Sequence, residues 1–137
     1  RHLLPYWKTS NRYLFSGGSV NMRDAAVYAK EENWSKAVEL WKQTYETKKG
    51  KQKMYAAYNT ALGYEMQDSI DTALEWALKA QTLAREKSKT DKKETGEIHN
   101  GTISYYIFIS MYVDELEKRK EGMARLNMQM NRFDDDF

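Results

Sequence analysis

The sequence predicts an all-α protein built from two antiparallel helical hairpins and one long C-terminal helix. Three observations support this fold class. Apolar residues recur at spacings of three and four along most of the chain. The 137 residues include 4 Trp, 10 Tyr and 4 Phe but a single proline, which favours packed helices over a turn-rich sandwich. The pattern of the first hairpin also returns in the second.

Residues 1–18 lack a regular pattern, so we expect an irregular N-terminal segment in which Pro5 opens a turn. Trp7, Leu14 and Phe15 make the segment too apolar for a free tail. The chain starts at Arg1 instead of Met, and we therefore expect it to be a mature or truncated part of a longer protein.

The two hairpins are expected at about 19–48 and 51–86. Ser19 is placed to cap the first helix, and Asn33 to end it and cap the second. Asp68–Ser69 interrupts the second hairpin. Residues 86–95 are rich in lysine and are expected to form an exposed connector, with Asp91 and Glu94 as a capping box for the helix that follows.

The last helix is expected at about 95–130, followed by an acidic tail at 131–137. Its apolar seam is interrupted once by a charge and consists of Ile109, Tyr112, Leu116, Arg119, Met123, Leu126 and Met130. Two roles remain open for this seam. In one role, the helix forms a homodimer through Met123, Leu126 and Met130. In the other, the helix folds back on the second hairpin as a cap.

A repeat with an offset of 36 residues connects the hairpins. Small residues match small ones and large residues match large ones, which lets paired helices approach closely and fills the groove beside them. The matching pairs are Ala25 with Ala61, Tyr28 with Tyr64, Trp34 with Ile70, and Ala37 with Ala73.

The second hairpin resembles a tetratricopeptide repeat. The stretch from Tyr58 to Tyr64 carries the resemblance, together with the small residues Ala73 and Ala80. The proline that usually follows the second helix is missing, and the offset is two residues longer than the common repeat. The resemblance implies a superhelix whose first helices line a concave groove.

The chain also resembles uncharacterised cell-envelope lipoproteins of gut anaerobes. The resemblance rests on Leu4-Pro5-Tyr6-Trp7, Trp34-Ser35-Lys36-Ala37 and Glu75-Trp76-Ala77. It implies that a lipid anchor and a separate domain precede this region and that the protein lies in the cell envelope. The family has no known activity to carry over.

Composition argues against several classes of function. The absence of cysteine excludes disulfides and thiolate chemistry. The net charge of +2 argues against a nucleic-acid partner. The longest apolar run, Tyr105 to Val113, is too short to span a bilayer, so we expect no direct membrane insertion of this region.

We expect no enzyme, no metal and no cofactor. His2 and His99 are the only histidines, and no nucleophile elbow or phosphate-binding loop is present. A cleft gathering Glu31, Glu65 or His99 would reverse this expectation.

The expected function is a non-catalytic interaction or assembly module that binds a protein or peptide and belongs to a larger protein. The binding candidates lie on the first helix of the second hairpin, where a concave groove is expected: Tyr58, Asn59, Leu62 and Glu65. Alternatively, Tyr58 and Leu62 simply pack on the neighbouring hairpin. A second reading of the whole chain is a structural accessory that braces a missing N-terminal domain carrying the activity.

Overall fold

The structure is a computed structural model that describes residues 3–5, 12–95 and 100–135, with side chains described over 12–89 and 105–132. The described residues form two short strands and five helices. These elements are β1 (Leu3–Pro5), β2 (Tyr13–Phe15), α1 (Val20–Lys30), α2 (Trp34–Thr47), α3 (Lys51–Met66), α4 (Ile70–Thr95) and α5 (Asn100–Asp135).

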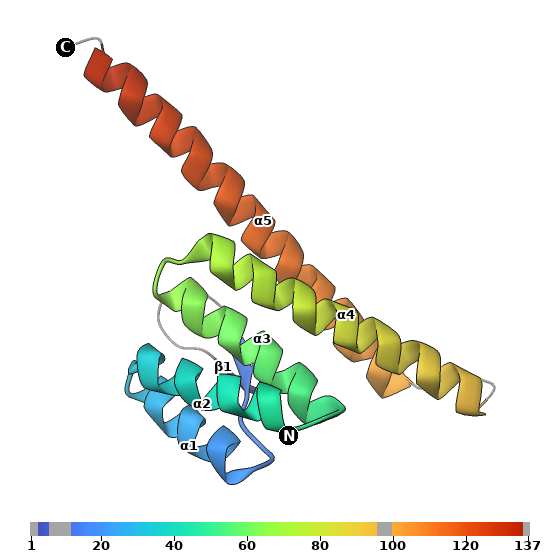
Figure 1. Ribbon diagram of the computed structural model, residues 1–137. Coiled ribbons are helices and arrows are strands. Elements are labelled where there is room, and N and C mark those ends of the chain that lie inside the picture. The colour runs from blue at the N-terminus through green and yellow to red at the C-terminus, as the bar shows by residue number, and fades with distance from the viewer. Residues whose placement is uncertain (1–2, 6–11, 96–99, 136–137) are drawn as a thin grey trace.

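The helices pack in chain order, each against the next (Figure 1). The pairs α1–α2 and α3–α4 are the two expected hairpins, and α5 packs along α4. The prediction of an all-α fold is confirmed. Among the described residues, no helix is both long and apolar enough to cross a membrane.

The helix starts follow from local side-chain chemistry. The Ser19 hydroxyl accepts a hydrogen bond from the Met22 backbone N–H at 3.4 Å, and the Asn33 side chain accepts one from Lys36 N–H at 3.3 Å. Both bonds satisfy amides that a helix leaves unpaired at its start. Gly50 precedes α3 with φ of 64°, a conformation that glycine adopts without steric strain.

Small residues set the spacing between helices. The repeat alanines Ala25, Ala37, Ala61 and Ala73 are all fully buried, as the close-approach interpretation requires. Gly63 marks an even closer contact between α3 and α2. A Cβ atom added there would overlap the Val38 side chain and lie 3.3 Å from the Trp41 ring.

Three boundaries differ from the sequence-based expectation. Residues 3–5 and 13–15 are not irregular but form an antiparallel pair in which Leu4 faces Leu14, and Pro5 lies in β1 instead of a turn. The expected connector at 86–95 is the last part of α4, so the backbone of Asp91 and Glu94 is helical instead of preceding a helix. The expected tail from 131 is helical to Asp135.

The physical reason for the longer helices is that polar residues do not end a helix by themselves. Residues 86–95 contain lysine, glutamate and threonine but no proline or glycine, and Lys89 lies 3.9 Å from Glu86 one turn away. Without proline or glycine, no residue in this segment ends the helix. The polarity of the segment was therefore not a sufficient reason to predict an irregular connector.

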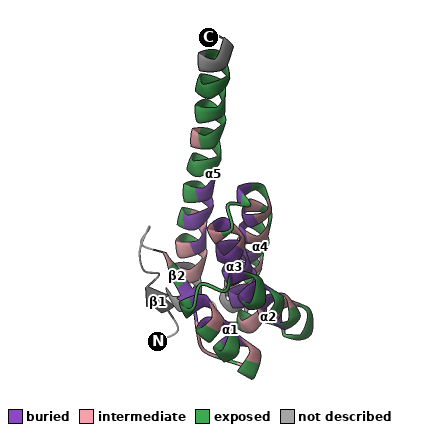
Figure 2. Cartoon of the chain, turned by 90° about the vertical axis from the view of Figure 1, so that its left-hand side faces the viewer, coloured by how far each residue is buried: buried purple, intermediate pink, exposed green. Residues whose placement is uncertain are grey.

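Half of α5 leaves the bundle. Ile109, Tyr112, Val113 and Leu116 are buried, whereas the residues after Leu116 are exposed apart from partly exposed Gly122, as far as the structure describes side chains. Figure 2 shows this change along the helix, and Figure 1 shows that the far half extends beyond α4. The seam is thus a cap over its first half only.

Candidate functional site

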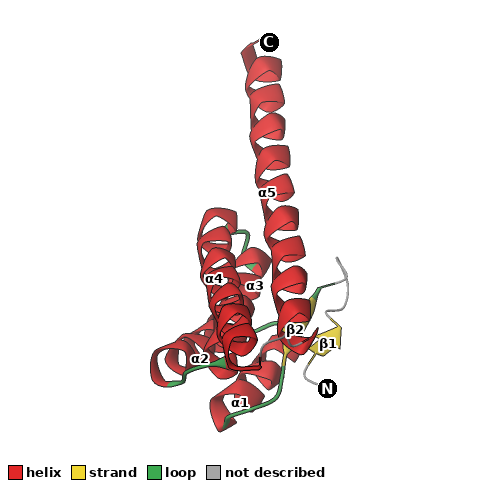
Figure 3. Ribbon diagram, turned by 90° about the vertical axis from the view of Figure 1, so that its right-hand side faces the viewer, coloured by secondary structure: helices red, strands yellow, loops and turns green. Residues whose placement is uncertain are grey.

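The face of α3 on which the binding candidates lie is covered by the chain itself. Tyr58, Asn59, Leu62 and Glu65 lie on α3 as expected, yet each is at most 1 % exposed. The prediction that they line an open groove is therefore wrong. The groove is filled by β2 and by the first half of α5, which lie beside each other next to α3 (Figure 3).

Asn59 holds the backbone of β2. Its Oδ1 accepts a hydrogen bond from the Phe15 N–H at 2.9 Å, and its Nδ2 donates to the Phe15 carbonyl at 2.7 Å. A neighbouring strand would satisfy the same two groups. Tyr58 adds a third bond, because its hydroxyl donates to the Tyr13 carbonyl at 2.6 Å. The side chains of α3 thus replace a β-partner along one edge of β2.

The Phe15 side chain also holds β2 in place, through ring contacts. It stacks on Tyr55 at 4.2 Å between ring centres and meets the edge of Tyr58 at 5.2 Å. Tyr105 and Phe108 of α5 also lie edge-on to it. Ring pairs in these geometries stabilise a core beyond their buried area. Phe15 is therefore an apolar anchor between α3 and α5.

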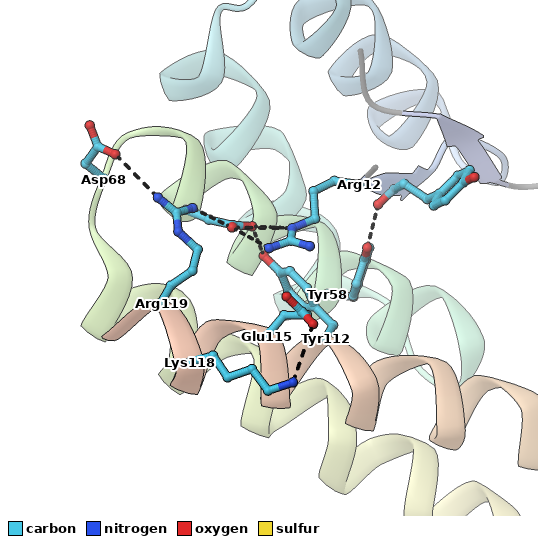
Figure 4. Close-up of polar contacts among 9 residues, drawn as sticks. Arg12, Tyr58, Asp68, Tyr112, Glu115, Lys118 and Arg119 are labelled. Carbon is cyan, nitrogen blue, oxygen red and sulfur yellow. Dashed lines mark hydrogen bonds and ion pairs between the residues drawn. The ribbon is translucent and has the colours of Figure 1, made fainter. Parts of the chain in front are cut away.

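Glu65 is the centre of a polar cluster, and its side chain is fully buried. Figure 4 shows its partners Arg12, Tyr112 and Arg119 converging on one place. Arg12 approaches with Nε at 3.2 Å from Oε1 and Nη2 at 3.0 Å from Oε2. Tyr112 donates its hydroxyl to Oε1 at 2.8 Å, and Arg119 donates Nη1 to Oε2 at 2.6 Å. Three separate parts of the chain, which are the residue before β2, α3 and α5, therefore meet on one carboxylate.

The electrostatics of this cluster keep Glu65 ionised. Burial alone would raise its pKa, but the hydrogen bonds from Arg12, Arg119 and Tyr112 outweigh burial and hold the pKa below its ordinary value. Burial, followed by the nearby Glu65 charge, raises the pKa of Tyr112 well above its ordinary value, so its hydroxyl stays protonated and donates. Arg12 also lies over the Tyr112 ring at 5.4 Å.

Chemically, this cluster is a latch. Both oxygens of Glu65 already accept hydrogen bonds from charged or hydroxyl donors, so neither is positioned to take a proton from another molecule. Two basic side chains neutralise the carboxylate where an unpaired charge would strongly destabilise the fold. We call Arg12, Glu65, Tyr112 and Arg119 the Glu65 latch.

The other residues considered for chemistry are not brought to Glu65. Glu31 is exposed at the end of α1. His2 and His99 lie outside the described residues. Over the part of the chain that the structure describes, no group of three or more histidine, aspartate or glutamate side chains is arranged to hold a metal ion.

Two open depressions adjoin α5. One, of about 250 Å³, lies between β2 and α5 beside Arg12, Tyr58 and Tyr112. The second, of about 430 Å³, lies where α5 leaves the bundle, between the start of α4 and the far half of α5. We call this second depression the exit groove. Its lining includes Asp71, Lys120, Met123, Ala124 and Asn127.

The far half of α5 carries an uncovered apolar stripe. Met123, Leu126 and Met130 continue the spacing of the buried residues Ile109, Tyr112 and Leu116, and their exposed fractions are 43 %, 56 % and 55 %. Residues three and four apart lie on one face of a helix. The same face is thus packed on the bundle at one end and open at the other.

The latch was missed because sequence spacing cannot show that Arg12 reaches Glu65 across 53 positions. One signal was available. Arg119 stands alone as a charge within the apolar seam, and a charged residue on a buried face requires a partner of opposite charge. Glu65, on α3, where most described side chains are buried, is that partner.

Comparisons with known proteins give a family but no activity. No curated protein and no solved structure matches the chain. Residues 23–118 match a family described as "Domain of unknown function (DUF6340)". The matched range runs from α1 to the part of α5 that packs on the bundle, and it covers more than half of the chain. The chain therefore belongs to the DUF6340 family.

Proposed function

We propose that this chain is a non-catalytic protein-interaction or assembly module whose binding element is the far half of α5. The observation that carries the proposal is the uncovered stripe of Met123, Leu126 and Met130. The bundle packs against the first half of α5, and the helix presents its apolar face beyond that bundle. Amphipathic helices commonly bind other proteins through such a face.

The α3 groove is already filled, which favours the far half of α5 over the groove face of α3 as the binding surface. The groove residues hold β2 and α5, and Glu65 is satisfied by three donors. A partner peptide would have to displace the N-terminal segment before it reached them. If the resemblance to tetratricopeptide proteins holds, the chain's own residues 13–15 lie against the helix face that would otherwise line the peptide groove.

The latch also supports a non-catalytic role. The most strongly buried carboxylate of the described chain is used to join three elements. Its function is to fix α5 on the bundle, which in turn fixes the direction of the projecting half. On this proposal, Arg12 and Arg119 hold the binding helix on the bundle through their bonds to Glu65.

The alternative role is that the chain braces an N-terminal domain, and most of the reason for proposing it no longer holds. It rested on Trp7, Leu14 and Phe15 as apolar residues without a partner. Leu14 and Phe15 are buried in the chain's own core, and Trp7 lies outside the described residues. A location in the cell envelope and membership of the tetratricopeptide class remain proposals that rest on the sequence resemblance.

The test is photo-crosslinking in cells that produce the full-length protein. A crosslinking amino acid at position 126 is compared with one at Val27 on α1, because Leu126 and Val27 are both 56 % exposed. We expect a discrete protein adduct from position 126 and none from position 27. Absence of an adduct from position 126, or equal adducts from both, would refute the proposal.

A further inference from the structure

Residues 12–15 contact the helices in the way that a bound peptide contacts its receptor. They precede α1, and residues 16–19, which include two glycines, connect them to it. They also precede the family match, which begins at residue 23, whereas the α3 and α5 residues that hold them lie within it. We call these holding residues the segment site: Tyr55, Tyr58, Asn59, Glu65, Tyr105 and Phe108. The matched region thus includes the site but not the segment that fills it.

Part of the segment site recognises backbone groups. Asn59 bonds to both the N–H and the carbonyl of Phe15, at 2.9 and 2.7 Å, and the Tyr58 hydroxyl bonds to the Tyr13 carbonyl at 2.6 Å. β1 pairs with the other edge of β2, so these bonds serve one edge only. Almost every residue carries the same backbone groups, so these bonds hold an extended segment whatever its side chains are. Selectivity then depends on the side-chain contacts.

The first selective contact is made with the ring of Phe15, which lies among four other rings. Tyr55 stacks on it with 4.2 Å between ring centres. Tyr58, Tyr105 and Phe108 present or receive ring edges at 5.2, 5.9 and 6.2 Å. Stacked and edge-on geometries require a flat ring between them. The site therefore selects an aromatic residue at this position of the segment.

The second selective contact is made by Glu65, which accepts hydrogen bonds from the Arg12 guanidinium. Arg119 and Tyr112 also donate to this carboxylate, at 2.6 and 2.8 Å. If Arg12 leaves, Arg119 still neutralises Glu65, so no buried carboxylate is left without a counter-charge. The Arg12 position can therefore be emptied and refilled while α5 stays attached to Glu65. The site selects an arginine three residues before the aromatic ring.

We propose that the segment site binds an extended segment of a partner protein that carries an arginine and, three residues later, an aromatic residue. Residues 12–15 of the chain itself occupy the site in this structure and act as an intramolecular competitor. A tethered segment has an effective concentration on the order of millimolar, so a partner binds only when it outcompetes or displaces the chain's own residues. This site is separate from the stripe on the far half of α5, and neither surface depends on the other.

The test removes the tether from the full chain. A protease site is inserted between Ser16 and Gly17, so that cleavage leaves residues 1–16 held by non-covalent contacts alone. The probe is a fluorescent peptide with the sequence of residues 11–17, and its anisotropy measures binding. We expect the probe to bind the cleaved chain at least about tenfold more tightly than the uncleaved chain, because cleavage ends the high effective concentration of the competitor.

Selectivity is tested with substitutions in the probe, which leave the protein itself unchanged. We expect Phe15→Ala and Arg12→Ala probes each to bind at least about tenfold more weakly, because they lose the ring contacts or the charged hydrogen bonds. The Tyr13→Ala probe is the matched control. The Tyr13 side chain is 39 % exposed, and its bond to Tyr58 comes from the backbone carbonyl. We expect this control to bind within about threefold of the unmodified probe.

Three results would overturn the proposal. The first is a cleaved chain that unfolds on dilution, measured by circular dichroism, because residues 12–15 would then be an essential part of the core. The second is a probe that does not bind the cleaved chain at about millimolar concentration, or that binds both chains equally. The third is equal binding by the Phe15→Ala, Arg12→Ala and Tyr13→Ala probes. None of these results affects crosslinking from position 126, which tests the far half of α5 separately.

Discussion

At the scale of single residues, Glu65 determines how the outer parts of the chain attach to the hairpins. It receives donors from Arg12, Tyr112 and Arg119, and it has no exposed surface. Buried ion pairs contribute little net stability over apolar packing, yet removing one partner leaves the others buried and unpaired. Its main effect is therefore to make any other arrangement of β2 and α5 unfavourable.

Glu65→Gln tests this role. Because two guanidinium groups lose their counter-charge, we expect the free energy of unfolding to fall by about 3–5 kcal/mol, as for other broken buried pairs. Chemical denaturation followed by circular dichroism measures the change. Glu115→Gln is the control, since Glu115 is half-exposed and contacts Lys118 at only 4.0 Å. We expect a change within about 0.5 kcal/mol for the control, and an equal loss in both variants would contradict the latch.

Stability should also depend on pH through Glu65. Its pKa is lower in the folded protein than the ordinary value of 4.5. The carboxylate therefore contributes stability that is fully present above the ordinary value and is lost as the pH falls through the lower folded value. We expect Tm to fall more steeply with acid in the wild type than in Glu65→Gln. Parallel Tm curves for the two proteins would show that Glu65 is not held ionised by its partners.

Asn59 permits a test confined to β2. Asn59→Ala leaves the N–H and carbonyl of Phe15 without partners, and each buried unpaired group costs about 1–3 kcal/mol. Hydrogen–deuterium exchange should then become faster at the Phe15 amide. Thr60→Ala is the control, because Thr60 is equally buried but bonds only to Ala56 in its own helix. Unchanged exchange at Phe15 in Asn59→Ala would show that packing alone holds β2.

At the scale of elements, helix spacing depends on which positions lack a side chain. Gly63 and Gly122 are both helical, but only Gly63 faces another helix closely. We expect Gly63→Ala to destabilise the fold by about 1–3 kcal/mol through overpacking against Val38. Gly122→Ala should stabilise it by about 0.5–1 kcal/mol, because open space surrounds the new methyl group and alanine is the better helix former.

A double-mutant cycle identifies the cause. Val38→Ala removes the methyl group that the new Cβ would overlap, so Gly63→Ala should cost less in the Val38→Ala background than in the wild type. Thermal unfolding of the four proteins gives the coupling. If the two changes were additive, crowding between α2 and α3 would not explain the glycine.

The sequence was informative where local chemistry decides the structure. Ser19 and Asn33 cap helices through their own neighbours, and the repeat alanines are buried because they recur at helical spacing. It was uninformative where distant segments compete for one surface. The α3 groove was expected to be open because nothing in residues 12–15 shows that Phe15 would bind Asn59 across 44 positions. The exposure of Met123, Leu126 and Met130 likewise depends on where α4 begins relative to α5.

At the scale of the whole molecule, α5 has a near half that packs on the bundle and a far half that does not. The boundary between them falls after Arg119. The near half supplies Ile109, Leu116 and the latch residue Arg119 to the bundle. The far half supplies the exposed stripe. The family match ends at residue 118, close to the same point. A fold that needs only the near half is free to use the far half for binding.

Two truncations test this division. A chain ending after Gly122 retains Arg119 and every buried residue of α5, so its free energy of unfolding should lie within about 1 kcal/mol of the wild type. A chain ending after Leu116 loses the Arg119 bond to Glu65, and a charged hydrogen bond contributes about 1.5–3 kcal/mol. Unfolding is measured at a concentration where the wild type is monomeric, because self-association would otherwise add to its stability. An equal loss in both truncated chains would mean that the far half belongs to the fold, and the exposed stripe would then need an explanation other than binding.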